Sequence, residues 1–208
     1  MIYLTKLDNT RIAIATDDAI TQTIESLKTN PDIVGISLIG STFILAEVQD
    51  LVAAINSSNV TTLKMSFSNG IDADGVKALA VALKDSTVTT LNLSSNKICN
   101  LGVKALAEEL ATNTTLTTLL LSNNMFAVDG VRALAKALAK NTTLTTLEHN
   151  SCSWEKAITP AQDYCDTIAA ILADNQARMP VAECLDNPAS DTIAPLGDAT
   201  VSDDIAQQ

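Results

Sequence analysis

The chain has 208 residues and carries 24 Asp or Glu against 13 Lys or Arg, a formal net charge of -11 at pH 7. A nucleic-acid-binding surface needs clustered basic residues that neutralise phosphates, so this balance argues against a nucleic-acid partner. With only 3 Phe, 2 Tyr and 1 Trp, the interior must be built from aliphatic side chains.

Targeting signals and cysteine pairing are not readable in the sequence. The longest uncharged stretch, residues 33–46, is shorter than the roughly 20 residues that a membrane-spanning helix needs. The first residues show no charged leader followed by an apolar run, so we predict a cytoplasmic protein without a membrane partner. No CxxC spacing is present, and we therefore predict reduced thiols at Cys99, Cys152, Cys165 and Cys184.

Residues 1–32 are predicted to form an N-terminal cap. Two short runs of alternating apolar residues flank Asp8-Asn9-Thr10, which is typical of a β-hairpin turn. A helix follows, and its apolar face is formed by Ile20, Ile24 and Leu27. This helix precedes Ile33 at the distance seen in later units, which indicates a degenerate first repeat.

Residues 33–150 contain one unit that recurs. The leading apolar residues of successive copies are 27 or 28 positions apart, at Ile33, Val60, Val88, Leu116 and Leu144. A fixed period of this size predicts a solenoid, in which each unit buries its apolar face against its neighbours. Such a chain generally presents a surface and does not enclose a pocket.

Each unit reads as strand, turn, helix and turn. In one copy, the alternation at Leu119 and Leu121 predicts a strand whose Leu120 side chain faces outward. Asn124 follows where the chain must turn, and an amide there can satisfy freed backbone groups. The next residues give an apolar helical stripe of Val131, Leu134, Ala135 and Leu138.

The pattern LxxLxLxxN in a 28-residue strand–helix unit resembles the leucine-rich repeats of the ribonuclease-inhibitor type, over residues 33–147. The resemblance implies an α/β fold: a curved horseshoe with parallel strands on its concave face and helices on its convex face. It also implies protein recognition, and inhibition of a partner enzyme is consistent with it. Two copies depart from the pattern, because Ser41 replaces the turn Asn and residues 67–70 include one extra residue.

The C-terminal part is predicted to form a cap and a tail. Thr159-Pro160-Ala161-Gln162 is a capping box within the predicted cap, residues 151–185. The helix that it begins has an apolar face of Tyr164, Ile168, Ile171 and Leu172. Residues 186–208 are rich in Pro, Ser, Asp and Thr and predict an acidic, mobile tail.

The single histidine, His149, lies near Cys152, which raises the alternative of a Cys/His enzyme or a metal site. His149 occupies the inward strand position that Leu121 holds one repeat earlier, so a partly buried structural role is the better interpretation. No zinc ligand set, phosphate-binding loop or nucleophile motif is present. We therefore predict that the protein is not an enzyme. We also predict that it has no catalytic residue and binds no metal, cofactor or small-molecule substrate.

The outward strand positions form the predicted partner-binding surface. Side chains there differ between repeats whose framework hardly varies, and three of them, at Ile39, Phe67 and Leu120, are apolar. The predicted contact residues, with Met125 beside them at a turn, are Ser37, Lys64, Phe67, Asn92, Ser94, Leu120, Ser122, Asn123, Glu148, Asn150 and Trp154.

A second, basic set is predicted on the outward faces of the helices: Lys77, Lys84, Lys104, Arg132, Lys136 and Lys140. It is either a binding patch or, as the nearby Glu108 and Glu109 favour, an ordinary solvated surface.

The sequence thus predicts a non-enzymatic module that binds a folded protein through its concave strand face. One alternative is a scaffold or actin-regulating protein, since the repeat domain of tropomodulin looks similar in size and period. Another is a bacterial effector that acts on a host protein. Such an effector would reach the host cell by a route independent of a signal peptide, with the acidic tail as its secretion signal.

Overall fold

The computed structural model divides into two compact units, residues 1–178 and 179–208. The described residues all belong to the first unit: 2–7, 10–16, 20–40, 45–66, 71, 73–84, 86–149 and 159–178. The predicted tail and the start and end of the predicted C-terminal cap lie outside them. The boundaries proposed for caps, repeats and tail therefore stay predictions.

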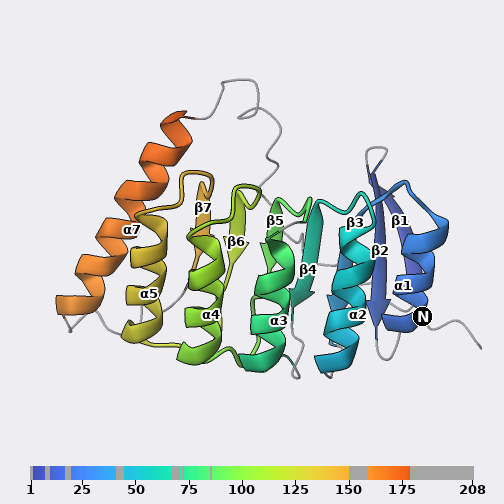
Figure 1. Ribbon diagram of the computed structural model, residues 1–208, viewed down its shortest axis with the longest axis horizontal. Helices are drawn as coiled ribbons and strands as arrows, with labels where there is room; N and C mark the ends of the chain where they lie inside the picture. The colour runs from blue at the N-terminus through green and yellow to red at the C-terminus, as the bar shows by residue number, and fades with distance from the viewer. Residues whose placement is uncertain are drawn as a thin grey trace, which may run out of the picture. The chain divides into compact units, whose positions relative to one another are not determined.

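The described residues of the first unit form one sheet of seven strands in sequence order (Figure 1). The first two strands pair antiparallel as the predicted hairpin, and every later pair is parallel. The strands are β1 (Ile2–Leu7), β2 (Thr10–Thr16), β3 (Ile33–Ile39), β4 (Thr62–Ser66), β5 (Thr90–Asn92), β6 (Thr118–Leu120) and β7 (Thr146–Glu148).

A helix follows each strand from β2 to β6 and returns the chain to the next strand. Figure 1 shows these helices side by side along one face of the sheet, as parallel crossovers require. They are α1 (Ile20–Thr29), α2 (Leu45–Asn56), α3 (Ala73–Leu83), α4 (Asn100–Leu110) and α5 (Val128–Leu138), with α7 (Thr159–Arg178) packed beside α5. The predicted α/β solenoid is confirmed.

The core lies between the sheet and the helices. Leu119 and Leu121 are 1% and 0% exposed, whereas Leu120 between them is half-buried, which confirms the predicted strand register. The helical stripe Val131, Leu134, Ala135 and Leu138 is buried as predicted. Burying an aliphatic side chain contributes about 1.5–3 kcal/mol, so these repeated positions supply most of the stabilisation.

In α4 and α5, a glycine near the start of the helix lets the helix pack closely on the preceding turn. A Cβ atom at Gly130 would lie 2.9 Å from Phe126 Cδ2, and one at Gly102 would lie 2.8 Å from Ile98 Cγ2. Both separations are shorter than van der Waals contact. Glycine is thus required before the helical stripe because the side chains of Phe126 and Ile98 leave no room for a Cβ atom.

Threonine hydroxyls link successive repeats just before each strand. Thr89 Oγ1 donates to Thr61 O, Thr117 Oγ1 to Thr89 O, and Thr145 Oγ1 to Thr117 O, at 3.1–3.3 Å. This explains the recurring Thr-Thr pair in the sequence, which offers one hydroxyl to the neighbouring repeat at each step.

Asparagines link the repeats within the same helix-to-strand turns, a few residues before these threonines. Asn141 is 3% exposed, and its Nδ2 donates to Leu110 O (2.8 Å) and Asn113 O (2.9 Å). Its Oδ1 accepts from the backbone N–H groups of Thr143 (3.0 Å) and Leu144 (2.8 Å). Each such amide therefore satisfies buried backbone groups on both sides of a turn.

Helix α7 continues this arrangement beyond the last strand. Asn175 Nδ2 donates to Asn141 O (3.2 Å) and Leu144 O (2.7 Å), and Ile168 is buried. On the same side, the Arg132 guanidinium lies 5.8 Å from the centre of the Tyr164 ring. This helix therefore covers the end of the repeat core, as its predicted apolar face requires.

One cysteine prediction is wrong. Cys165 in α7 is disulfide-bonded, whereas Cys99 is free. Sequence spacing alone does not show which thiols a helix and its flanking segments bring together. In the described part of the chain, no helix combines the length and the apolar character needed to cross a bilayer.

Candidate protein-binding surface

The predicted contact residues form columns across the sheet. The parallel register places Ser37, Lys64, Asn92, Leu120 and Glu148 side by side on consecutive strands. Since neighbouring strands lie about 4.8 Å apart, the five side chains span roughly 20 Å. This column was predicted from the sequence and is present in the structure.

The column is not uniformly accessible. Glu148 is exposed, and Lys64, Asn92 and Leu120 are half-buried. Ser37 is only 8% exposed, because its side chain is short and β3 is paired along most of its length with both β2 and β4. We therefore remove Ser37 from the candidate contacts.

A second column flanks the first on the same face. Ser66 pairs in register with Ile39, and Ser94 and Ser122 hold the equivalent positions after β5 and β6, both half-buried. Asn92 Oδ1 accepts the Ser94 backbone N–H at 2.9 Å, which fixes the amide plane of Asn92. Three other predicted contacts, Phe67, Asn150 and Trp154, lie outside the described residues.

Asn123 has a backbone role that the sequence prediction did not assign. It adopts a left-handed conformation with φ of 58°, as Ser95 does with φ of 58° and Gly40 with φ of 73° at the equivalent positions. Asparagine tolerates this region better than most residues. Asn123 Nδ2 also donates to Ser95 Oγ at 3.5 Å. The turn therefore gives a structural reason for asparagine at this position, in addition to any contact with a partner.

The sequence analysis missed a third column. Thr62, Thr90, Thr118 and Thr146 are aligned in register two residues before the Lys64–Glu148 column, and all four are half-buried. Strand alternation could have identified them, because residues two apart share a face. They give the Lys64–Glu148 column a uniform polar border on one side.

The character of that column changes from one end to the other. It begins with the Lys64 ammonium, passes through the Asn92 amide and the Leu120 isobutyl group, and ends at the Glu148 carboxylate. The two charges are about 14 Å apart across three strand spacings, too far for an ion pair. Such a row can orient a partner through its ends and contact it through Leu120.

Of the two residues in the Cys/His alternative, His149 lies in the described part of the chain and Cys152 lies outside it. No group of three His, Cys, Asp or Glu residues that could hold a metal ion occurs there. The backbone N–H groups of Gly102 and Leu101, at the start of α4 beside Cys99, lower the pKa of this thiol. A thiol at a helix N-terminus has this property without any catalytic base.

His149 follows β7 at the place that Leu121 holds after β6, and it is half-buried as predicted. Burial lowers the pKa of its imidazole below the ordinary value of 6.5. Well above pH 6.5 the imidazole is neutral in both the folded and the unfolded chain and contributes no pH dependence. As the pH falls through 6.5, the unfolded chain binds the proton first and stability decreases.

We expect His149→Gln to reduce the loss of stability between pH 7.5 and pH 5. The measurement is the denaturation midpoint in urea for wild type and variant at each pH, with the wild-type midpoint falling more steeply. Parallel pH profiles for the two proteins would show that His149 is not desolvated in the folded chain.

Comparison with known sequences identifies the repeats. A family model described as "Leucine Rich repeat" matches residues 56–80, 84–107 and 112–135. These segments correspond to the three strand–helix units β4–α3, β5–α4 and β6–α5. These three segments of the chain are leucine-rich repeats.

Solved structures with the same fold include a leiomodin-1 domain and a tropomodulin domain. The chain matches a structure of leiomodin-1 actin-binding site 2 (ABS2) with a TM-score of 0.64 and 23% identity, over 75% of this chain and 88% of the other. It matches the tropomodulin C-terminal domain of Caenorhabditis elegans with a TM-score of 0.62 and 14% identity, over 76% and 94%. At these identities the likeness shows the fold alone. No curated protein matches the chain.

Proposed function

We propose that this chain is a non-enzymatic module that binds a folded protein through the outward face of its strands. The observation that carries the proposal is the Lys64–Asn92–Leu120–Glu148 column. Its members occupy equivalent positions in repeats of nearly constant framework, yet they differ in charge and polarity. Leucine-rich repeats use such extended surfaces for recognition.

Leu120 is the best candidate for a dominant contact in the described part of this surface. It is the only apolar member of its column, and polar residues surround it: Asn92 and Glu148 on the neighbouring strands and Thr118 and Ser122 on its own. An apolar side chain within a polar border is the usual arrangement at the centre of an interface. Lys64 and Asn92 would then set the orientation of the partner.

The test is affinity purification with mass spectrometry, using wild type and Leu120→Asp as baits. We expect the partner recovered by wild type to be lost with the variant, since a central apolar contact is worth about 2 kcal/mol or more. The matched control is Val81→Asp on α3, whose side chain is 54% exposed on the helix face. Equal recovery by wild type and Leu120→Asp, together with loss by Val81→Asp, would contradict the proposal.

A second candidate is an actin-regulating or scaffold function. It is favoured by the fold shared with leiomodin-1 actin-binding site 2 and the tropomodulin domain. Co-sedimentation with actin filaments, and capture of actin monomers, test it directly. Absence of binding in both assays would remove this candidate and leave the general proposal standing.

Inhibition of a partner enzyme and delivery into a host cell remain hypotheses that rest on the sequence. Deletion of residues 187–208 tests delivery into a host cell. If this segment is a secretion signal, the deletion abolishes export and leaves partner binding in solution unchanged.

A further inference from the structure

The helix face carries a groove that the strand-face proposal does not use. It lies between α4 and α5, and small residues form its floor: Ala107, Ala111, Ala133 and Ala137. Lys104 and Glu108 border it on α4, and Lys136 and Lys140 border it on the side of α5. Its volume of about 260 Å³ is below the ~300–1,000 Å³ of small-molecule sites, so a ridge of protein side chains fits it better.

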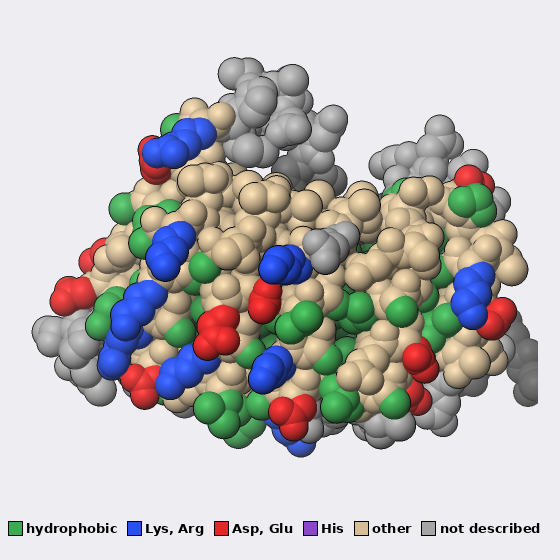
Figure 2. Space-filling model, viewed as in Figure 1, with side chains coloured by type: hydrophobic (Ala, Val, Ile, Leu, Met, Phe, Trp, Pro, Cys, Tyr) green, Lys and Arg blue, Asp and Glu red, His purple; other side chains and the backbone are tan. Residues whose placement is uncertain are grey.

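The groove is basic on an acidic protein. Its border contributes three Lys against one Glu, whereas the whole chain has a formal net charge of -11. Figure 2 shows Lys and Arg side chains gathered over α5 and the adjoining part of α4. No ion pair joins Lys104, Lys136 or Lys140 to any residue in the described ranges. Their charge is thus left for a partner.

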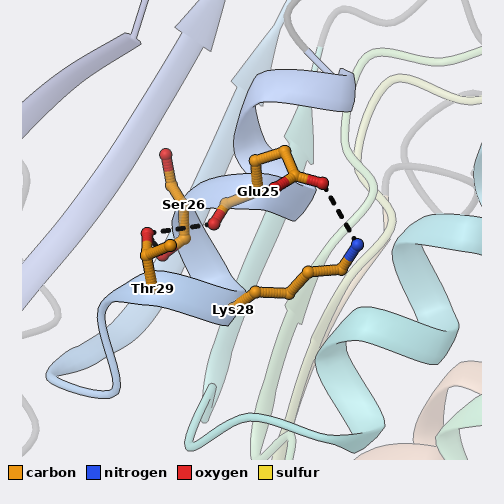
Figure 3. A network of polar contacts seen from close by, with 4 residues as sticks. All are labelled: Glu25, Ser26, Lys28 and Thr29. Atoms are coloured by element: carbon orange, nitrogen blue, oxygen red, sulfur yellow. Dashed lines mark hydrogen bonds and ion pairs between the residues drawn. The ribbon is translucent and has the colours of Figure 1, made fainter.

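The corresponding groove between α1 and α2 has the opposite character. Lys28 is its one basic residue, beside Glu25, Glu47 and Asp50. The Lys28 ammonium there contacts Glu25 Oε1 at 3.2 Å on the same helix (Figure 3). The repeat architecture alone therefore does not create a basic groove. The positive charge is a property of the groove between α4 and α5.

One helix position shows this change directly. Val81, Glu108 and Lys136 each lie five residues after the first core valine of their helices, in α3, α4 and α5. The side chain at this position is therefore apolar, then acidic, then basic, while the buried stripe beside it stays aliphatic.

The geometry points to an acidic helix of a partner protein as the occupant of the α4–α5 groove. Lys136 and Lys140 are four residues apart along α5 and its end, a rise of about 6 Å, which matches carboxylates at i and i+4 of a helix. Lys104 lies across the groove and contacts the other flank of such a helix. The alanine floor permits the close approach that helix packing at about 8–10 Å requires.

The occupant is a protein helix, and a phosphate backbone is a poorer match. Three lysines neutralise few phosphates, and the net charge of -11 repels a polyanion outside the groove. A helix brings its carboxylates only along one stripe and can place small side chains against the alanines. This surface is separate from the strand face, so the two could bind different partners at once.

The test uses the full-length chain and a fluorescein-labelled peptide of about 18 residues, long enough to form helix, with Glu at every fourth position and Ala between. The control peptide has Gln in place of Glu. Binding is followed by fluorescence anisotropy at about 0.05 M and about 0.5 M salt, because exposed ion pairs weaken with screening. We expect saturable binding of the Glu peptide alone, and weaker binding at high salt.

The deciding variant is Lys104→Gln/Lys136→Gln/Lys140→Gln, which we expect to lower peptide affinity at least about tenfold. Lys28→Gln/Lys77→Gln/Lys84→Gln removes the same charge elsewhere on the helix face and should retain the affinity. Equal losses for the two variants would overturn the proposal in favour of general charge attraction. So would the absence of peptide binding, or binding of phosphatidylserine vesicles without peptide binding.

Discussion

Replacing Leu119 by alanine is expected to lower the free energy of unfolding by roughly 2–5 kcal/mol. The side chain is 1% exposed and lies in β6, paired in register with Leu91 and Leu147 on the neighbouring strands. Its removal leaves a cavity that rigid neighbours fill only in part. Because each repeat supplies the interface of the next, the loss extends to the adjacent repeats.

Urea denaturation followed by circular dichroism measures this effect, and Leu120→Ala is the matched control. Leu120 is also a leucine of β6, but it faces outward and is half-buried. Its truncation should therefore lower the free energy of unfolding by about 1 kcal/mol or less. If Leu119→Ala unfolds at the wild-type midpoint, or Leu120→Ala is the more damaging change, the strand register described above is wrong.

The second large effect is expected at Asn141. Replacement by alanine removes donors from Leu110 O and Asn113 O and an acceptor from the N–H groups of Thr143 and Leu144. A buried polar group left without a partner costs about 1–3 kcal/mol, so we expect a total loss of roughly 2–4 kcal/mol. The relaxed turn would admit water to some of these groups, which keeps the cost below the sum.

Asn59→Ala is the control for Asn141→Ala. Asn59 is exposed, and its Nδ2 donates to Pro31 O at 3.1 Å, so water can replace this hydrogen bond. Its truncation should change the urea midpoint little. Similar midpoints for the two variants would show that the amides between repeats do not contribute to stability as their burial implies.

The repeated unit could be predicted because its physical causes are local. Alternation at Leu119 and Leu121 and the stripe from Val131 to Leu138 each follow from one element facing one core. The 28-residue period then determines the register between strands, so the Lys64–Glu148 column could also be derived from the sequence. The outward-facing residues could be predicted as those that alternate with the buried residues along each strand.

Other features depend on contacts between distant residues and were not predictable in this way. The hydrogen bond from Asn141 Nδ2 to Leu110 O spans 31 residues, and the identity of its acceptor depends on how two turns are stacked. The burial of Ser37 depends on the pairing of β3 with β2 and β4, and the disulfide at Cys165 depends on spatial proximity. The left-handed backbone at Asn123 could not be predicted either, because asparagine is common both in turns and in binding surfaces.

Photo-cross-linking from single positions tests the central claim, that the strand face binds a protein. A photoreactive residue is placed at Ser122, beside Leu120 on the outward strand face, and in a second protein at Leu101, which is 68% exposed on α4. Each protein is mixed with the partner recovered by affinity purification and irradiated. We predict a covalent adduct with the partner from position 122 and none from position 101. An adduct from position 101 alone would contradict this account and assign the partner to the helices.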